Sequence, residues 1–96
     1  MGAESFITTR RGRNRQDAFL EAVKQAQYEY GHRGYTGTIA EKTEYVSIQV
    51  PEGLEPRFYA KSMIDNCDSR IYDKWGPAGC IDLGGDEYLF FGWASS

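Results

Sequence analysis

The chain has few of the side chains from which metal sites and disulfide frameworks are built. It holds one histidine, His32, and two cysteines, Cys67 and Cys80. One histidine cannot supply a multi-histidine metal site, and two cysteines so far apart do not match zinc-ligand spacing. We therefore expect no metal and no cofactor.

Long apolar runs are also missing. No stretch approaches the roughly 20 apolar residues that a membrane helix needs. The first residues, MGAESFITTRR, lack the apolar centre of a secretory signal, and Phe6 stands where a myristoylation signal needs Ser or Thr. These features predict a cytoplasmic protein without membrane contact. In that compartment Cys67 and Cys80 are expected to be reduced thiols, and a disulfide between them is the alternative.

Aromatic side chains are abundant for a chain of this length. Of 96 residues, 41% are hydrophobic and 15% aromatic, which is typical of a globular protein and not of a disordered one. A chain this long supports one modest hydrophobic core. We expect a single domain over residues 1–96.

The first half of the chain predicts a strand followed by a long helix. Residues 5–11 are rich in side chains that favour extended structure. The helix is predicted over 15–30, with Asn14 as its N-cap and Gly31 as its stop. Its apolar stripe has helical spacing and consists of Phe19, Ala22, Val23, Ala26 and Tyr30.

The second half predicts further strands and a shorter helix. Residues 35–39 could form a short strand, and 44–50 alternate as a half-buried antiparallel strand does. A helix is predicted over 54–66, with Pro56 in its first turn. Residues 80–93 predict a hairpin whose last strand is apolar on both faces and therefore central. The predicted fold is α+β: a four- to five-stranded, mainly antiparallel sheet with two helices packed on one face.

Charge is unevenly distributed along the chain. The net charge is −3, but residues 1–40 carry +2 and residues 41–96 carry −5. Four arginines crowd a predicted strand end, turn and helix start: Arg10, Arg11, Arg13 and Arg15. Guanidinium groups beside helix N–H groups can bind phosphate, so this turn is a candidate site for nucleotide or nucleic acid. A solvated charged turn is the alternative.

The stretch GHRGYTG, residues 31–37, invites comparison with a phosphate loop. It follows a helix, however, whereas phosphate loops precede one so that helix N–H groups face the ligand. His32, Arg33 and Tyr35 are instead expected to form a polar rim at the end of the helix. An enzyme built on His32, with Tyr35 and Glu41 nearby in the sequence, is a further hypothesis.

A tryptophan stands in the predicted loop DKWGPAG, residues 73–79. A loop tryptophan can anchor a protein interface, or it can fold back over the core. Trp75 is therefore a candidate binding residue.

Three blocks of sequence resemble a family of small, largely uncharacterised proteins of tailed bacteriophages and prophages. They are AFLEAVKQAQYEYGH with the strand before it, GYTGTIAEK, and KWGPAGCIDL with YLFFGWAS, and together they span most of the chain. The resemblance implies a phage-encoded protein that acts in the bacterial cytoplasm. It brings no catalytic residues with it.

These observations rank the hypotheses of function. The first is a non-enzymatic phage accessory protein that binds a host or phage macromolecule, most readily a protein, with host takeover or anti-defence as its purpose. The second is a nucleotide or nucleic-acid binder that uses the Arg10–Arg15 turn. The third is a small enzyme that uses His32. A homodimer is expected from the prevalence of two-fold dimers among small domains.

Overall fold

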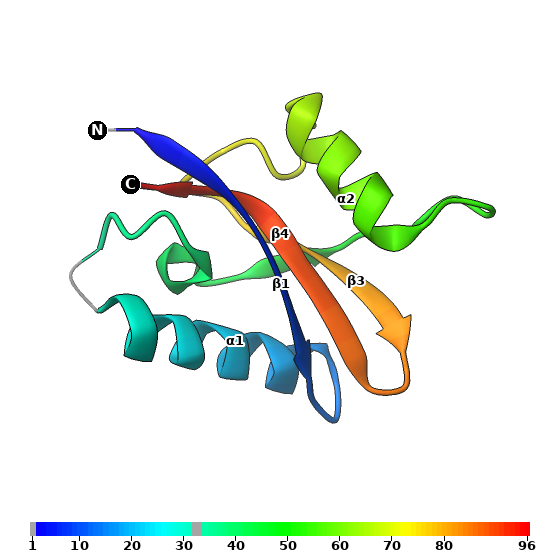
Figure 1. The fold of residues 1–96 in the computed structure, drawn as a ribbon, viewed down its shortest axis with the longest axis horizontal. Coiled ribbons are helices and arrows are strands. Elements are labelled where there is room, and N and C mark those ends of the chain that lie inside the picture. The colour runs from blue at the N-terminus through cyan, green and yellow to red at the C-terminus, as the bar shows by residue number, and fades with distance from the viewer. Residues whose placement is uncertain (1, 32–33) are drawn as a thin grey trace.

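The computed structural model describes residues 2–31 and 34–96, and it shows an α+β fold with one four-stranded mixed sheet and two helices (Figure 1). In chain order the elements are β1 (Ala3–Arg11), α1 (Arg15–Tyr30), the 3-10 helix η1 (Ile39–Glu41), β2 (Tyr45–Ser47), α2 (Pro56–Asp65), β3 (Ala78–Gly84) and β4 (Glu87–Ser95). No helix of the described residues is both long and apolar enough to cross a bilayer.

The strands lie in the order β1-β4-β3-β2, so β4 is central, as its two apolar faces predict. It pairs antiparallel with β1 and with β3, the latter through the predicted hairpin. β2 pairs parallel with β3, so the prediction of an antiparallel partner for residues 44–50 is wrong. The reason is the connection: α2 lies between β2 and β3 in the chain, and such a crossover returns the chain in the same direction.

The two helices cover opposite faces of the sheet (Figure 1). The prediction that both pack on one face is therefore wrong. Alternation along β4 explains the outcome, because Tyr88 and Phe90 point to the α1 side while Leu89 and Phe91 point to the α2 side. Each apolar face needs its own cover.

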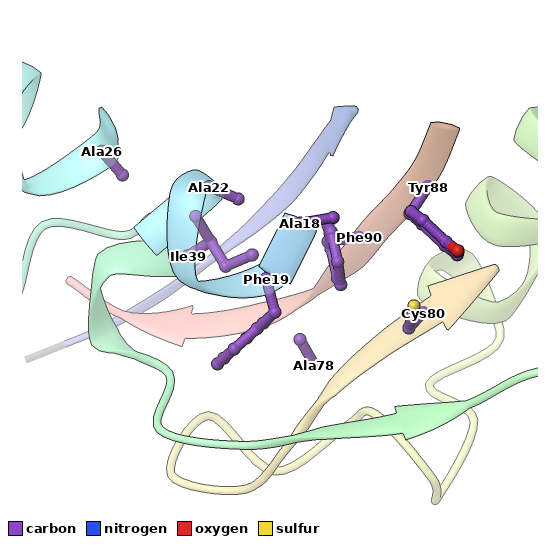
Figure 2. Packing of buried hydrophobic residues seen from close by; sticks show 9 residues of the cluster. All are labelled: Ala18, Phe19, Ala22, Ala26, Ile39, Ala78, Cys80, Tyr88 and Phe90. Atoms are coloured by element: carbon purple, nitrogen blue, oxygen red, sulfur yellow. The ribbon is translucent and has the colours of Figure 1, made fainter. Parts of the chain in front are cut away.

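The core on the α1 side is built around aromatic rings (Figure 2). The ring of Phe19 lies 5.1 Å from that of Tyr45 and 5.7 Å from that of Phe90, centroid to centroid. Ala18, Ala22 and other small residues of α1 fill the space between the helix and the sheet. A helix that presents mainly alanine lies close to the strands, so the two layers are tightly packed.

Both ends of α1 follow the sequence prediction. The side chain of Asn14 accepts a hydrogen bond from the Asp17 N–H, 2.8 Å away. Gly31 has a φ of +98° and donates its N–H to the Gln27 carbonyl. Tyr30 is 60% exposed, so its assignment to the buried stripe is wrong.

Residues 35–39 do not form the expected strand. The segment leads into η1, where the Thr38 hydroxyl accepts a hydrogen bond from the Ala40 N–H. A threonine that caps a helical turn competes with strand pairing for the same backbone groups. Ile39 is buried against α1 and helps to close the core on that side.

The two cysteines should differ sharply in reactivity. Cys67 is exposed after α2, whereas Cys80 is buried on β3, where burial raises the pKa of its thiol to about 11. At pH 8 a chromogenic disulfide reagent should therefore modify one thiol of the native protein quickly and the second only after unfolding in guanidinium. The Cys67→Ser variant is the control and should show no fast phase. Two fast thiols in the native protein would contradict the packing of β3.

Candidate binding surface

The loop between α2 and β3 carries Trp75 into solvent. Its side chain is 65% exposed, so it does not fold back over the core. The Trp75 backbone N–H donates to the Asp73 carboxylate at 2.9 Å, which forms a local turn. An exposed indole of this size stands out on a protein surface, where large apolar groups mark interaction sites when they cluster.

A buried lysine holds this loop in place. Lys42 follows η1 and is only 3% exposed. Its ammonium donates to the carbonyl oxygens of Asp73, Lys74 and Gly76, at 3.3, 3.3 and 2.9 Å. These three acceptors flank Trp75 in the sequence, so one side chain ties down the backbone on both sides of the indole. Burial lowers the pKa of the Lys42 ammonium to about 8, and the negative charge of Asp73 opposes that change.

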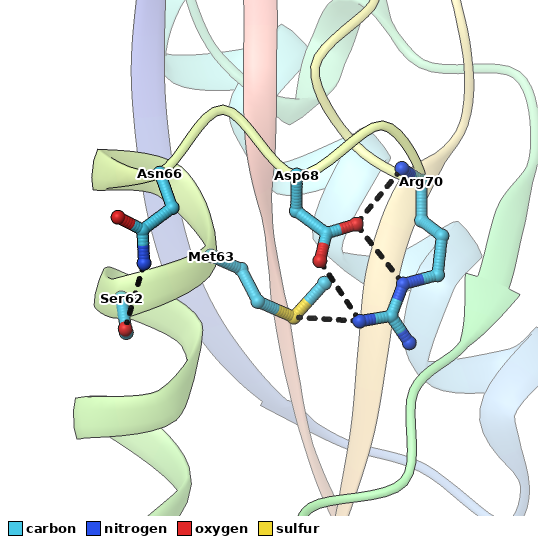
Figure 3. A network of polar contacts seen from close by, with 5 residues as sticks. All are labelled: Ser62, Met63, Asn66, Asp68 and Arg70. Carbon is cyan, nitrogen blue, oxygen red and sulfur yellow. Dashed lines mark hydrogen bonds and ion pairs between the residues drawn. The ribbon is translucent and has the colours of Figure 1, made fainter.

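An arginine fixes the start of the same loop (Figure 3). The guanidinium of Arg70 donates from Nε and Nη2 to the two oxygens of Asp68, at 3.0 and 2.9 Å. It also reaches the sulfur of Met63 on α2, at 4.0 Å. The hydrogen bonds from Arg70 hold the pKa of the Asp68 carboxyl below its usual range. The loop is thus joined to α2 at one end and to Lys42 at the other.

Two predicted binding residues, Tyr35 and Trp75, meet on the surface. Their rings lie edge to face with centroids 6.2 Å apart. The Lys74 ammonium lies 5.5 Å from the centre of the Trp75 ring and donates to the Gly2 carbonyl at 3.2 Å. The indole is therefore contacted on two sides, which restricts its rotamers.

An apolar hollow of about 530 Å³ adjoins the indole. It is lined by Ala3, Cys67, Tyr72, Asp73, Lys74, Trp75 and Trp93. Tyr72 is 57% exposed and Tyr35 54%. We refer to these aromatic residues with their lysine, namely Tyr35, Tyr72, Lys74, Trp75 and Trp93, as the Trp75 surface.

The four clustered arginines spread in different directions. Arg10 and Arg11 are neighbours on β1, so their side chains leave opposite faces of the strand. Arg13 lies 3.6 Å from Asp17 and Arg15 lies 3.9 Å from Asp82, measured between charged atoms. Arg15 also stacks over the Tyr88 ring, 5.9 Å from its centre. The arrangement does not direct the four guanidinium groups to one anion.

The start of α1 uses its own side chains as hydrogen-bond partners. The Asp17 carboxylate accepts the Arg13 N–H at 3.1 Å, while Asn14 accepts the Asp17 N–H. A carboxylate already lies where a bound phosphate would gain from the helix N-terminus. This occupancy weakens the candidate phosphate site at the Arg10–Arg15 turn.

The two described residues of the enzyme hypothesis, Tyr35 and Glu41, make separate contacts. His32 and Arg33 lie outside the described residues. The Glu41 carboxylate accepts hydrogen bonds from the N–H and hydroxyl of Thr36, at 3.1 and 2.7 Å, and so closes the loop before η1. Tyr35 points to Trp75 instead. Among residues 2–31 and 34–96, no group of three or more His, Cys, Asp or Glu side chains is placed to hold a metal ion.

The sequence did not point to three residues of this region: Lys42, Tyr72 and Trp93. A lysine is read as a surface residue, and nothing near Lys42 in the sequence signals its distant carbonyl partners. Trp93 sits in a strand predicted to be core, and Tyr72 in a stretch with no periodic pattern. For the aromatic residues of the Trp75 surface, the high aromatic content of the chain was the one feature of the sequence that could have indicated an aromatic surface.

Comparisons of this chain with protein-family models, with curated proteins and with solved structures found no match.

Removing the Lys42 ammonium should loosen the loop. The Lys42→Met variant leaves three carbonyl groups without their donor, and we expect the free energy of unfolding to fall by about 1–3 kcal/mol. The intrinsic fluorescence of the native protein should also change, since Trp75 lies between those carbonyls. Urea denaturation followed by fluorescence and by circular dichroism measures both effects.

The matched control is Lys61→Met. Lys61 is exposed on α2 and pairs with Asp65 at 3.8 Å, so its replacement should change stability by less than about 0.5 kcal/mol. Equal effects of the two substitutions would mean that the three carbonyl contacts do not stabilise the loop.

The contribution of Lys42 should depend on pH. Its pKa is about 8 when folded and 10.5 in the reference state, so between these values the unfolded chain holds a proton that the folded chain has released. Raising the pH through this window therefore favours the folded state. We expect wild type to gain stability relative to Lys42→Met between pH 8 and 10.5, by denaturation at several pH values. If the difference in the free energy of unfolding between wild type and Lys42→Met stays constant or shrinks as the pH rises, the carbonyl groups keep the Lys42 ammonium charged and its pKa is not lowered.

Proposed function

We propose that this protein is a non-enzymatic binding protein whose Trp75 surface docks onto a protein partner. The observation that carries the proposal is a highly exposed tryptophan in a loop that a buried lysine holds rigid. Tryptophan is among the residues that most often dominate interface energies. Because the loop is already ordered, little conformational entropy is lost when a partner binds.

The shape of the surface supports a proposal for the chemistry of the partner. Trp75 projects outward beside an apolar hollow, so a partner would offer a pocket for the indole and an apolar side chain for the hollow. Lys74 lies at the rim and favours a carboxylate beside that pocket. A folded protein surface supplies these three features together.

The resemblance to small phage and prophage proteins supports a setting for this binding. In an infected bacterium the partner would be a host or phage protein in the cytoplasm, and the purpose would be host takeover or anti-defence. The nucleotide or nucleic-acid alternative depends on the Arg10–Arg15 turn. It is the weaker proposal because those guanidinium groups diverge and two of them lie beside carboxylates.

Loss of the indole should greatly weaken binding to the partner. We expect an affinity column carrying the wild-type protein to retain one stoichiometric protein from a bacterial host lysate. The purified partner should bind the Trp75→Ala variant at least about 30-fold more weakly by calorimetry, the effect of removing an interface hot spot. The loss arises because the partner's pocket is left empty.

Phe58→Ala is the control, since Phe58 is 64% exposed on α2 and does not belong to the Trp75 surface. Its affinity should match wild type. A partner that binds Trp75→Ala as tightly as wild type would refute the proposal. Retention of nucleic acid that is lost in an Arg11→Ala, Arg13→Ala double variant would instead favour the arginine turn.

A further inference from the structure

The strand β1 forms a free edge of the sheet. It pairs with β4 on one side, and no strand of the described residues pairs with its other side. Its nine residues keep one unbroken register with β4 and include no proline. Proteins usually protect long edge strands with prolines, bulges or covering segments. A long, regular and open edge is therefore a place where another strand can pair.

The backbone groups that face this open edge can be identified. Gly2 exchanges hydrogen bonds with Ser96, and the Gly12 N–H donates to Asp86, so the even-numbered residues of β1 point their backbone groups toward β4. In an antiparallel ladder these groups alternate in direction along a strand. The groups that face the free edge are therefore those of Ala3, Ser5, Ile7, Thr9 and Arg11.

We propose that β1 pairs antiparallel with β1 of a second copy of this chain, about a two-fold axis at Ile7, so that two sheets join into one. In this register Ile7 lies opposite its own copy, and Ala3 lies opposite Arg11. Every edge-facing residue then opposes another edge-facing residue, so each outward N–H and C=O finds a partner. The strands overlap along their full length.

Charge selects the same register. With the axis at Ile7, the numbers of any two facing residues add up to fourteen. Glu4 of each chain therefore lies opposite Arg10 of the other, so the dimer contains this pair on both sides of the axis. These residues occupy non-hydrogen-bonded positions, where opposing side chains approach most closely. Sliding the strands by two residues in either direction shortens the overlap and leaves Arg10 opposite Phe6 or Gly2. Full pairing and charge matching therefore coincide in one arrangement.

The surroundings of the edge suit a second copy. Ile7 is 43% exposed on the α2 side of the sheet and belongs to neither core cluster, and pairing would place it against its counterpart. On the other face, a small hollow of about 180 Å³ opens between β1 and α1, lined in part by Phe6, Thr8, Ala22 and Ala26. The copy would close that hollow as well as the strand edge.

Charge reversal tests both the dimer and its register. Sedimentation equilibrium over a concentration series should show a monomer–dimer equilibrium for wild type. Glu4→Arg and Arg10→Glu each place like charges together twice, and each should weaken dimerisation on the order of tenfold or more. The Glu4→Arg, Arg10→Glu double variant should restore it, because the pairs are then exchanged.

Mixing the two single variants gives a sharper test. One chain then carries two positive charges and the other two negative ones, so the mixture should form a heterodimer that neither variant forms with itself. This recovery also shows that the variants are folded. Arg57→Glu and Glu52→Arg, which make the same charge changes at exposed sites away from β1, should dimerise like wild type.

A backbone variant completes the experiment. Ile7→Pro removes an N–H that points to the free edge, which an edge strand tolerates, and it should abolish dimerisation while the circular dichroism spectrum is kept. A wild-type protein that is monomeric at all concentrations would overturn the proposal. A dimer that still forms with Ile7→Pro would show that the β1 edge is not the interface. A mixture of the two single variants that stays monomeric would show that the register is wrong.

Discussion

The fold depends on the burial of β4 on both of its faces. The side chains of Tyr88 and Phe90 on one side and of Leu89 and Phe91 on the other are all 7% exposed or less. A strand that is apolar on both sides cannot leave either face to water, so it needs two covers. The chain meets this requirement by placing α1 before the central hairpin on one side and α2 on the other. The parallel pairing of β2 with β3 follows, since α2 must cross the sheet between them. The same crossover brings the chain back through the loop that bears Trp75.

The parts of the fold that local chemistry determines could be predicted from sequence. Asn14 and Gly31 mark the two ends of α1 because capping and a positive φ are demands that one or two residues satisfy alone. The hairpin of β3 and β4 could be predicted for the same reason, because a short glycine-containing turn between two apolar runs is a local signal. The face of the sheet on which each helix packs could not be predicted in this way. An apolar stripe indicates that one side of a helix is buried, but it does not indicate which face of the sheet buries it. The alternation within β4 held that information, since two apolar faces require two covers.

The candidate site divides in a similar way. Trp75 could be chosen as a candidate binding residue from the sequence, because a tryptophan in a loop with glycine and proline is conspicuous. Lys42, which holds that loop in place, could not. Lys42 is 31 to 34 residues from the carbonyl groups that it binds, and only the folded chain brings them together. The arginine run shows the opposite error. Arg10 and Arg11 are adjacent in the sequence, but adjacent residues of a strand point to opposite faces, so closeness in the chain becomes separation in space.

The edge and the Trp75 surface have a joint consequence. Ala3, at the start of β1, lines the hollow beside Trp75, so that surface lies toward one end of the strand. A two-fold axis at Ile7 would reverse the second strand and place its Trp75 surface toward the opposite end of the joined edge. The two surfaces would then be far apart and free to engage partners at the same time. Two linked sites raise the effective concentration of the second once the first is bound, so even modest affinity at each tryptophan would hold a partner that is itself dimeric or repetitive. An open strand edge, otherwise a liability for aggregation, would thereby serve binding through the charge pairs that select a single register.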